Sequence, residues 1–127
     1  MITIDHLDHL VLTVLSIEAT CAFYADVLGM RVERFGAGRT ALRFGNQKIN
    51  LHEVGRELEP KAKRPTPGSA DLCFITESPL DDVIADLARL GIPIEVSPVD
   101  RTGATGPIRS VYVRDPDMNL IEISNRR

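Results

Sequence analysis

Residues 115–124 read DPDMNLIEIS, a turn signal followed by a strand signal. Asp-Pro-Asp with Asn close behind is typical of a tight turn, and the β-branched residues that follow favour a strand. Because successive strand side chains point to opposite faces, Ile121 and Ile123 share one face and Glu122 lies on the other. If the isoleucine face packs into the core, Glu122 points into solvent or into a cavity. A single strand carboxylate is most simply a solvated residue, and only the rest of the chain favours a cavity.

The composition of the 127 residues predicts one compact domain, residues 1–127. A net charge of −3 without a run of Lys or Arg argues against nucleic acid or an anionic membrane as a partner. Cys21 and Cys73 have no CxxC spacing, which indicates a reduced, cytoplasmic setting. The first residues lack the pattern of a signal peptide, and no apolar stretch has membrane-span length.

The first half predicts a strand, a capped helix and three more strands. Ser16 is the expected helix N-cap, and Gly29 is placed where a glycine ends a helix. Gly45-Asn46 is a two-residue hairpin signal. The strands are expected at residues 7–14, 30–35, 40–44 and 47–54.

A polar, proline-containing connector without periodicity follows at residues 55–69. The second half then repeats the first. Ser78 is the expected N-cap, with Pro79 as the first helical residue, and Gly91 ends the helix. Strands are expected at residues 70–76, 92–96, 109–114 and 120–124, and a loop at residues 98–107.

The two halves can be aligned as one βαβββ unit written twice. His9 aligns with Asp71, and Asn50 aligns with Glu122. Repeats of one supersecondary unit usually share a core. We therefore predict an α+β fold of two paired βαβββ modules, with a curved mixed sheet around a central cup and the helices outside. The modules span about residues 5–54 and 70–125.

The faces away from the helices would line this cup with polar side chains. Imidazoles and carboxylates from separate strands suit a divalent ion such as Zn, Mn, Fe, Co or Ni. A single histidine on a strand is more often a partly buried residue with ordinary hydrogen bonds than a metal ligand. The metal interpretation therefore depends on the repeat, which brings several such residues to one cup. The Gly- and Thr-containing stretch 101–106 would serve as an anion cradle, a lid or a plain connector. The polar set comprises His9, Thr13, Asn50, His52, Asp71, Cys73, Glu122 and Ser124.

The chain resembles the vicinal oxygen chelate superfamily, which includes glyoxalase I, bleomycin-resistance proteins and extradiol dioxygenases. The resemblance is carried by residues 7–14, 22–30 and 113–123. Residues 49–55 and 101–108 are similar to the subgroup of glyoxalase-domain-containing protein 5. The resemblance implies a single glyoxalase-like domain, a homodimer and a divalent metal in the cup.

Family metal ligands fall, by position, on His9, Asn50, Asp71 and Glu122. Asn50 and Asp71 depart from the family pattern, in which Glu or Gln and His are usual. His52, two residues past Asn50 on the same strand face, would supply the missing nitrogen. The expected metal ligands are therefore His9, His52 and Glu122, with Asp71 and Glu122 as catalytic carboxylates.

Two classes of function follow. The first is a metal-dependent enzyme that binds two oxygens of a small molecule and catalyses isomerisation, epimerisation or thiol addition. The alternative is a non-enzymatic protein of the bleomycin-resistance type that binds or sequesters a small molecule. The chain has no Trp to stack on a planar ligand, which argues against this alternative. Secondary substrate contacts are expected from Asn50, Thr13 and Arg109.

Overall fold

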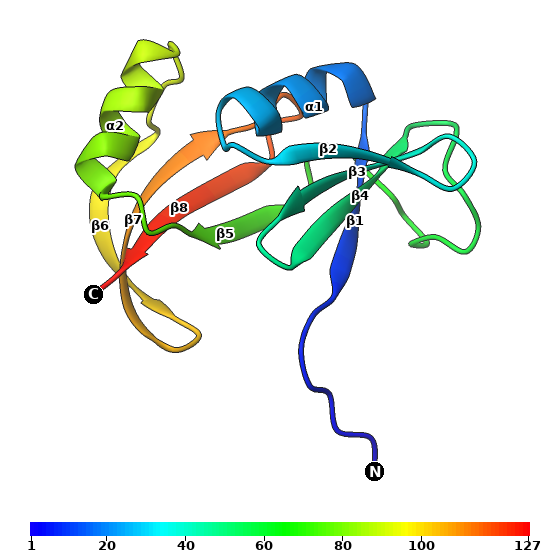
Figure 1. Ribbon diagram of the computed structural model, residues 1–127, viewed down its shortest axis with the longest axis horizontal. Helices are drawn as coiled ribbons and strands as arrows, with labels where there is room; N and C mark the ends of the chain where they lie inside the picture. Colours follow the sequence, from blue (N-terminus) through cyan, green and yellow to red (C-terminus); the bar gives the residue numbers. More distant parts are fainter. The chain divides into compact units, whose positions relative to one another are not determined.

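The computed structural model describes residues 1–127 and divides into two compact units. The N-terminal unit is Met1–Pro67 and the C-terminal unit is Gly68–Arg127. Each unit has the element order βαβββ, with one helix and one four-stranded mixed sheet (Figure 1). The predicted α+β fold of two βαβββ modules is therefore confirmed.

The N-terminal unit orders its strands β1-β4-β3-β2, with β1 parallel to β4 and the other pairs antiparallel. A two-residue turn at Gly45-Asn46 joins β3 to β4, because Phe44 pairs with Gln47. Val14, Leu42 and Ile49 are almost fully buried and share one face of the sheet. Helix α1 packs against β2, β3 and β4 of this sheet (Figure 1). The elements are β1 His9–Val14, α1 Ile17–Asp26, β2 Arg31–Phe35, β3 Arg39–Phe44 and β4 Gln47–Glu53.

Helix α1 begins and ends as its sequence predicts. The Ser16 side chain accepts a hydrogen bond from the backbone N–H of Ala19 at 3.1 Å, which satisfies one free donor of the first turn. Gly29 follows the helix with a φ of +68°, a conformation that residues with a Cβ rarely adopt. The connector after β4 contains no helix or strand up to β5.

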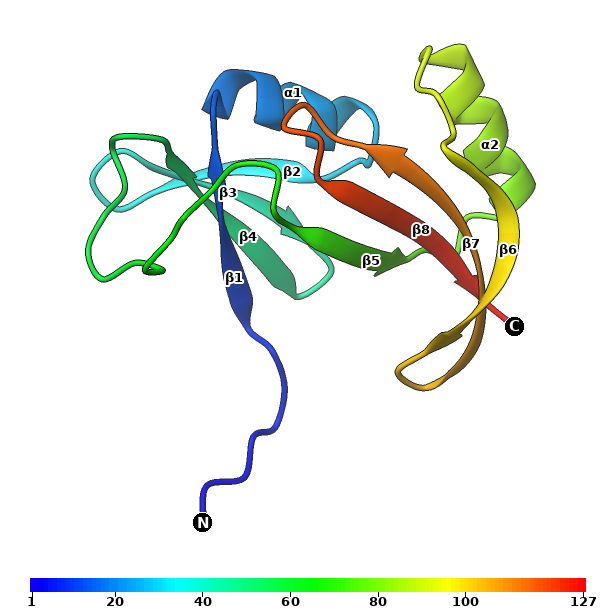
Figure 2. The same ribbon diagram turned by 180° about the vertical axis from the view of Figure 1, so that it is seen from behind.

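The C-terminal unit repeats the arrangement with strand order β5-β8-β7-β6 and β5 parallel to β8. Figure 2 shows these four strands side by side, with α2 beside β6 and β7. Ile121, Val111 and Val113 are fully buried at the centre of the sheet. The elements are β5 Asp71–Ile75, α2 Leu80–Arg89, β6 Val96–Gly103, β7 Gly106–Arg114 and β8 Leu120–Arg126.

Three predictions for this unit are wrong. Ser78 is not the N-cap of α2: the cap position is Pro79, which offers no side-chain hydrogen bond, and the Asn125 side chain accepts from the N–H of Leu80 instead, at 2.8 Å. The stretch expected to be a loop is mostly strand, because β6 runs on to Gly103 and turns tightly into β7. The strand expected at residues 92–96 starts only at Val96.

The turn before β8 is built from its own side chains. Asp115 is 3% exposed, and its Oδ1 accepts from the N–H groups of Asp117 and Asn119, both at 2.9 Å. The Asn119 amide donates to Asp115 Oδ2 at 2.8 Å and accepts from the N–H of Ala70 at 2.8 Å. Gly68 fits beside this turn only because it has no Cβ, which would lie 2.6 Å from the Asp117 carbonyl oxygen. The turn therefore fixes the start of β5 as well as β8.

Neither helix of the chain has the length and apolar content needed to cross a membrane.

Candidate functional site

The face of the C-terminal sheet that carries Glu122 is polar and partly open. Glu122 on β8 pairs with Cys73 on β5 and with Tyr112 on β7, so these three side chains share one face. Ile121 and Ile123 point to the opposite face and are 0% and 5% exposed. Glu122 is half-buried. The alternation expected from the sequence is therefore present, with Glu122 away from the isoleucine core.

A chain of hydrogen bonds runs below Glu122. The Ser110 hydroxyl donates to Glu122 Oε2 at 2.6 Å and lies 2.7 Å from the Ser124 hydroxyl. The Ser124 hydroxyl is in turn 3.3 Å from the Cys73 sulfur. Both serines are fully buried. Hydrogen bonds that involve an ionised carboxylate are short and strong, so this chain holds the Glu122 side chain in one orientation.

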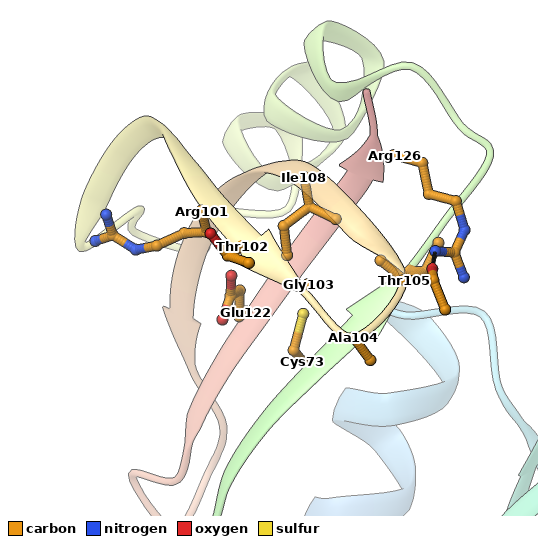
Figure 3. A pocket seen from close by; sticks show the side chains of 10 residues that line it. Cys73, Arg101, Thr102, Gly103, Ala104, Thr105, Ile108, Glu122 and Arg126 are labelled. Atoms are coloured by element: carbon orange, nitrogen blue, oxygen red, sulfur yellow. Dashed lines mark hydrogen bonds between the residues drawn. The ribbon is translucent and has the colours of Figure 1, made fainter.

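Glu122 and Cys73 line a pocket of about 360 Å³, which we call the Glu122 pocket (Figure 3). Ile75 and Ile108 form an apolar part of the pocket wall, and Arg101 and Arg126 contribute cationic side chains. The β6–β7 hairpin closes one side with Thr102, Gly103, Ala104 and Thr105. A few polar groups on an apolar wall are typical of small-molecule sites.

Gly103 lets the hairpin approach the pocket wall closely. A Cβ at this position would lie 3.0 Å from the Gly106 carbonyl oxygen and 3.0 Å from Ile108 Cγ2. Ile108 is itself only 3% exposed. A side chain at position 103 would therefore displace either the turn or the isoleucine of the pocket wall.

The surroundings of Cys73 raise the pKa of its thiol, which favours the neutral form. Its partial burial raises the pKa, and the charge of Glu122 raises it further, while the hydrogen bond with Ser124 acts in the opposite direction. Cys21, the second cysteine, is free and only 8% exposed, and burial raises its pKa too.

The other site residues expected in this unit lie apart from the pocket wall. Asp71 shares its strand face with Cys73 and is exposed, but it does not line the pocket. Arg109 follows Ile108, so it points to the opposite sheet face, where it pairs with Asp100 at 3.0 Å. The expectation that Arg109 contacts the substrate does not fit this orientation.

The sequence analysis does not predict that Ser110 is a hydrogen-bond partner of Glu122, or that Arg126 lines the pocket. One signal points to both. Ser110 and Arg126 occupy strand positions of the same parity as residues already assigned to the Glu122 face. The sequence places Arg101 in a stretch expected to be an anion cradle, a lid or a plain connector, whereas the structure places it in strand β6.

The N-terminal unit carries the remaining predicted residues on one sheet face. Val11 pairs with Asn50 and Thr13 pairs with His52, so His9, Asn50 and His52 point the same way. His52 lies level with a residue four positions beyond His9, which is roughly 13 Å along the strands, whereas Asn50 lies about half as far. The register therefore favours Asn50 over His52 as the companion of His9.

Two of these side chains have distinctive surroundings. His9 Nδ1 and Asp8 Oδ2 are 2.8 Å apart, and this hydrogen bond lowers the pKa of the Asp8 carboxyl. Asn50 is 4% exposed, and its side-chain oxygen is buried without a hydrogen-bond partner. A buried carbonyl oxygen left unpaired is unfavourable, so this atom is suited to receive a cation or a donor. Within either unit, no three His, Cys, Asp or Glu side chains converge as a metal site.

Comparison with known proteins gives close matches over almost the whole chain. The virulence protein STM3117 of Salmonella typhimurium is 60% identical over 121 residues, which cover 95% of this chain and 84% of that protein. Its crystal structure matches with a TM-score of 0.98, covering 99% of this chain and all of that one. The glyoxalase domain-containing protein RDO1 of Mycosarcoma maydis is 53% identical over 98% of this chain and 70% of its own length.

More distant structures share the fold. A lactoylglutathione lyase from Agrobacterium tumefaciens is 25% identical with a TM-score of 0.70, over 94% of this chain and 92% of that one. The profile of the Glyoxalase/Bleomycin resistance protein/Dioxygenase superfamily matches residues 6–123. With the fold, the profile and these relatives in agreement, the chain belongs to the Glyoxalase/Bleomycin resistance protein/Dioxygenase superfamily.

Proposed function

We propose that this protein is an enzyme that acts on a small oxygen-containing molecule in the Glu122 pocket. The observation that carries the proposal is the Glu122 carboxylate, which lines the pocket and is held by the Ser110 hydroxyl at 2.6 Å. A volume of about 360 Å³ falls in the range of small-ligand sites. A carboxylate in a fixed orientation at a cavity wall is suited to bind or move a proton.

Glu122 is proposed as the general base, with Asp71 as a second carboxylate on the same strand face. One of the two would act on a proton next to a carbonyl or hydroxyl group, which fits isomerisation, epimerisation or thiol addition. Glu122 is the better placed, because it lines the pocket and Asp71 does not. The apolar side chains of Ile75 and Ile108 would exclude water from the reacting groups.

We further propose that His9 and Glu122 bind a divalent ion, with a third ligand from Asn50 or His52. The donor chemistry fits: Asp8 fixes His9 through Nδ1 and leaves Nε2 as the ligating nitrogen, and the unpaired Asn50 oxygen is a neutral ligand. Such an ion would polarise two oxygens of the substrate. Zn, Mn, Fe, Co and Ni all accept this mixture of nitrogen and oxygen ligands.

Metal analysis of the purified protein and five variants tests this part. We expect stoichiometric metal in the wild type and its loss in His9→Ala and Glu122→Ala. Of Asn50→Leu and His52→Ala, the variant that removes the third ligand should also lose the metal, and the strand register favours Asn50 for this role. His6→Ala is the matched control, since His6 is also exposed and contacts the neighbouring Asp5 at 2.6 Å. Stoichiometric metal that survives both His9→Ala and Glu122→Ala would refute the site. A ligand that binds the pocket without metal or turnover would instead identify a sequestering protein.

We also propose that the protein is a cytoplasmic homodimer. Both cysteines are free in the structure, which is consistent with a reducing compartment. Each sheet leaves two edge strands unpaired within its own unit, and such edges are usually covered.

A further inference from the structure

We propose that the Glu122 pocket selects ligands that carry an oxyanion, a carboxylate or a phosphoryl group, and that Arg101 is the cation that binds it. Arg126 provides a second positive charge at the same pocket. The inference rests on the proposed function because it concerns the same pocket, and it adds the chemical class of the ligand.

The pattern of ion pairs in the C-terminal unit singles out these two arginines. The four arginines that lie away from the pocket each have a carboxylate partner: Arg89 with Asp86 at 3.5 Å, Arg109 with Asp100 at 3.0 Å, Arg114 with Glu95 at 2.8 Å and Arg127 with Asp100 at 2.7 Å. Arg101 and Arg126 line the pocket and have no ion pair. Their charges are therefore available to an external anion.

Glu122 does not neutralise either of them. It is the only acidic residue that lines the pocket, and its hydrogen bond comes from the Ser110 hydroxyl, not from a guanidinium. The pocket wall therefore carries two positive charges and one negative charge. A ligand with one anionic group would balance this excess.

Arg101 is held in place before a ligand arrives. Its Nε donates to the Tyr112 hydroxyl at 3.0 Å, and its guanidinium carbon lies 5.6 Å from the centre of the Tyr112 ring. Tyr112 is only 8% exposed and pairs directly with Glu122 across β7 and β8. One terminal nitrogen, Nη1, also donates to the Asp100 carbonyl oxygen at 3.4 Å. Nη2 and the second hydrogen of Nη1 are left for binding of a carboxylate or phosphoryl group, with less side-chain entropy to lose.

Arg126 stands on the other side of the pocket. Figure 3 shows Arg101 and Arg126 flanking Cys73 and Glu122, and Arg126 donates to the hydroxyl of Thr105 in the hairpin. In Figure 3 both guanidinium groups point outward from Cys73 and Glu122. An oxyanion bound at Arg101 would therefore sit at the edge of the pocket, and the rest of the ligand would extend inward toward the Glu122 carboxylate. This places the reacting part of the ligand next to the proposed base.

Cys73 provides a direct readout, because it lines the same pocket while Cys21 is buried. We would measure the alkylation rate of Cys73 by iodoacetate and by iodoacetamide, which differ mainly in charge. We expect the ratio of the two rates to fall about threefold or more in Arg101→Gln, to fall less in Arg126→Gln, and to be retained in Arg101→Lys. Added salt should reduce the wild-type ratio, since exposed charges are screened.

Arg89→Gln is the matched control, because it removes one exposed arginine charge from helix α2, away from the pocket. Cys73→Ser verifies that the labelled thiol is Cys73, and thermal melts verify that each variant is folded. An unchanged ratio in folded Arg101→Gln, or an equal fall in Arg89→Gln, would overturn the proposal.

Competition then separates the two oxyanion classes. Glycolate and inorganic phosphate are tested for protection of Cys73 against the neutral reagent iodoacetamide, with uncharged glycolamide as the control for glycolate. Saturable protection by glycolate or by phosphate, lost in Arg101→Gln, supports the carboxylate or the phosphoryl form; protection by neither overturns both. Since alkylation requires neither metal nor turnover, a failed metal site and a failed anion site give different results.

Discussion

Met118 has a backbone conformation that residues with a Cβ rarely adopt, with a φ of 70°. It is 61% exposed, so its side chain contributes little buried area. A left-handed conformation is unfavourable by about 1–2 kcal/mol for residues with a Cβ, and glycine avoids this cost. Part of that gain is offset because glycine has more conformational freedom in the unfolded chain. We therefore expect Met118→Gly to raise the free energy of unfolding by about 0.5 kcal/mol in urea denaturation. Met118→Ala is the control and should leave it nearly unchanged; a less stable glycine variant would contradict the prediction.

Cys73 offers a test of the charges around Glu122 in metal-free protein. Because burial and the Glu122 charge raise the thiol pKa, alkylation by iodoacetamide should reach half its maximal rate at a higher pH than for free cysteine. Glu122→Gln should move this midpoint down, but not fully back, since burial is the larger cause. Ser124→Ala should move it up, because the Ser124 hydrogen bond lowers the pKa. Shifts in the same direction for both variants would contradict the arrangement.

Among the secondary-structure elements, helix α2 depends on a residue 45 positions away for its N-terminal cap. Asn125 accepts from the N–H of Leu80 and donates to the carbonyl oxygens of Thr76 and Ser78, both at 2.9 Å. Loss of a cap and its companion bonds typically lowers stability by about 1–2 kcal/mol. We expect Asn125→Ala to lower the free energy of unfolding by this amount, and Ser78→Ala to change it little. A larger effect of Ser78→Ala would mean that the cap predicted from the sequence is the functional one.

Local signals predicted most elements because their causes are local. The Ser16 cap, the helix-ending Gly29 and the Gly45-Asn46 hairpin all depend on neighbouring residues and are present as predicted. Strand β6 was missed because Pro98 and the glycines after it are typical of loops. Proline is tolerated in edge strands and at bulges, and β6 is an edge strand whose register shifts between Val96 and Val99, around Pro98. The position of a strand in its sheet cannot be read from local sequence.

For the whole molecule, the repeat predicted the fold and the face of Glu122, but not the groups around it. Neighbouring side chains on a strand point to opposite faces of the sheet. The sequence alone therefore predicts that Glu122 lies on the face opposite Ile121 and Ile123. The Ser110 hydrogen bond and the Arg101 contact with Tyr112 depend on the pairing register of β7 with its two neighbours. Register is set by tertiary structure, so these two contacts could not be predicted from the sequence.

The same strand order bears on the assembly of the protein. Within their units, β1, β2, β5 and β6 are edge strands, and each carries an exposed apolar residue: Val11, Val32, Ile75 and Val96 are 39–45% exposed. Unpaired edges with apolar side chains favour association with another chain. Light scattering after size exclusion should therefore give twice the chain mass of 14.0 kDa.

Lysine variants locate the contact. Val11→Lys, Val32→Lys and Val96→Lys each place a charge on one edge strand, and at least one of them should reduce the mass to that of a single chain, because burying an unpaired charge is strongly unfavourable. Leu58→Lys is the control, since Leu58 is equally exposed, at 48%, but lies in the connector and not on a strand edge. A single-chain mass at every protein concentration would contradict the predicted dimer. A dimer that withstands all three edge variants would show that β1, β2 and β6 are not the edges through which two chains associate.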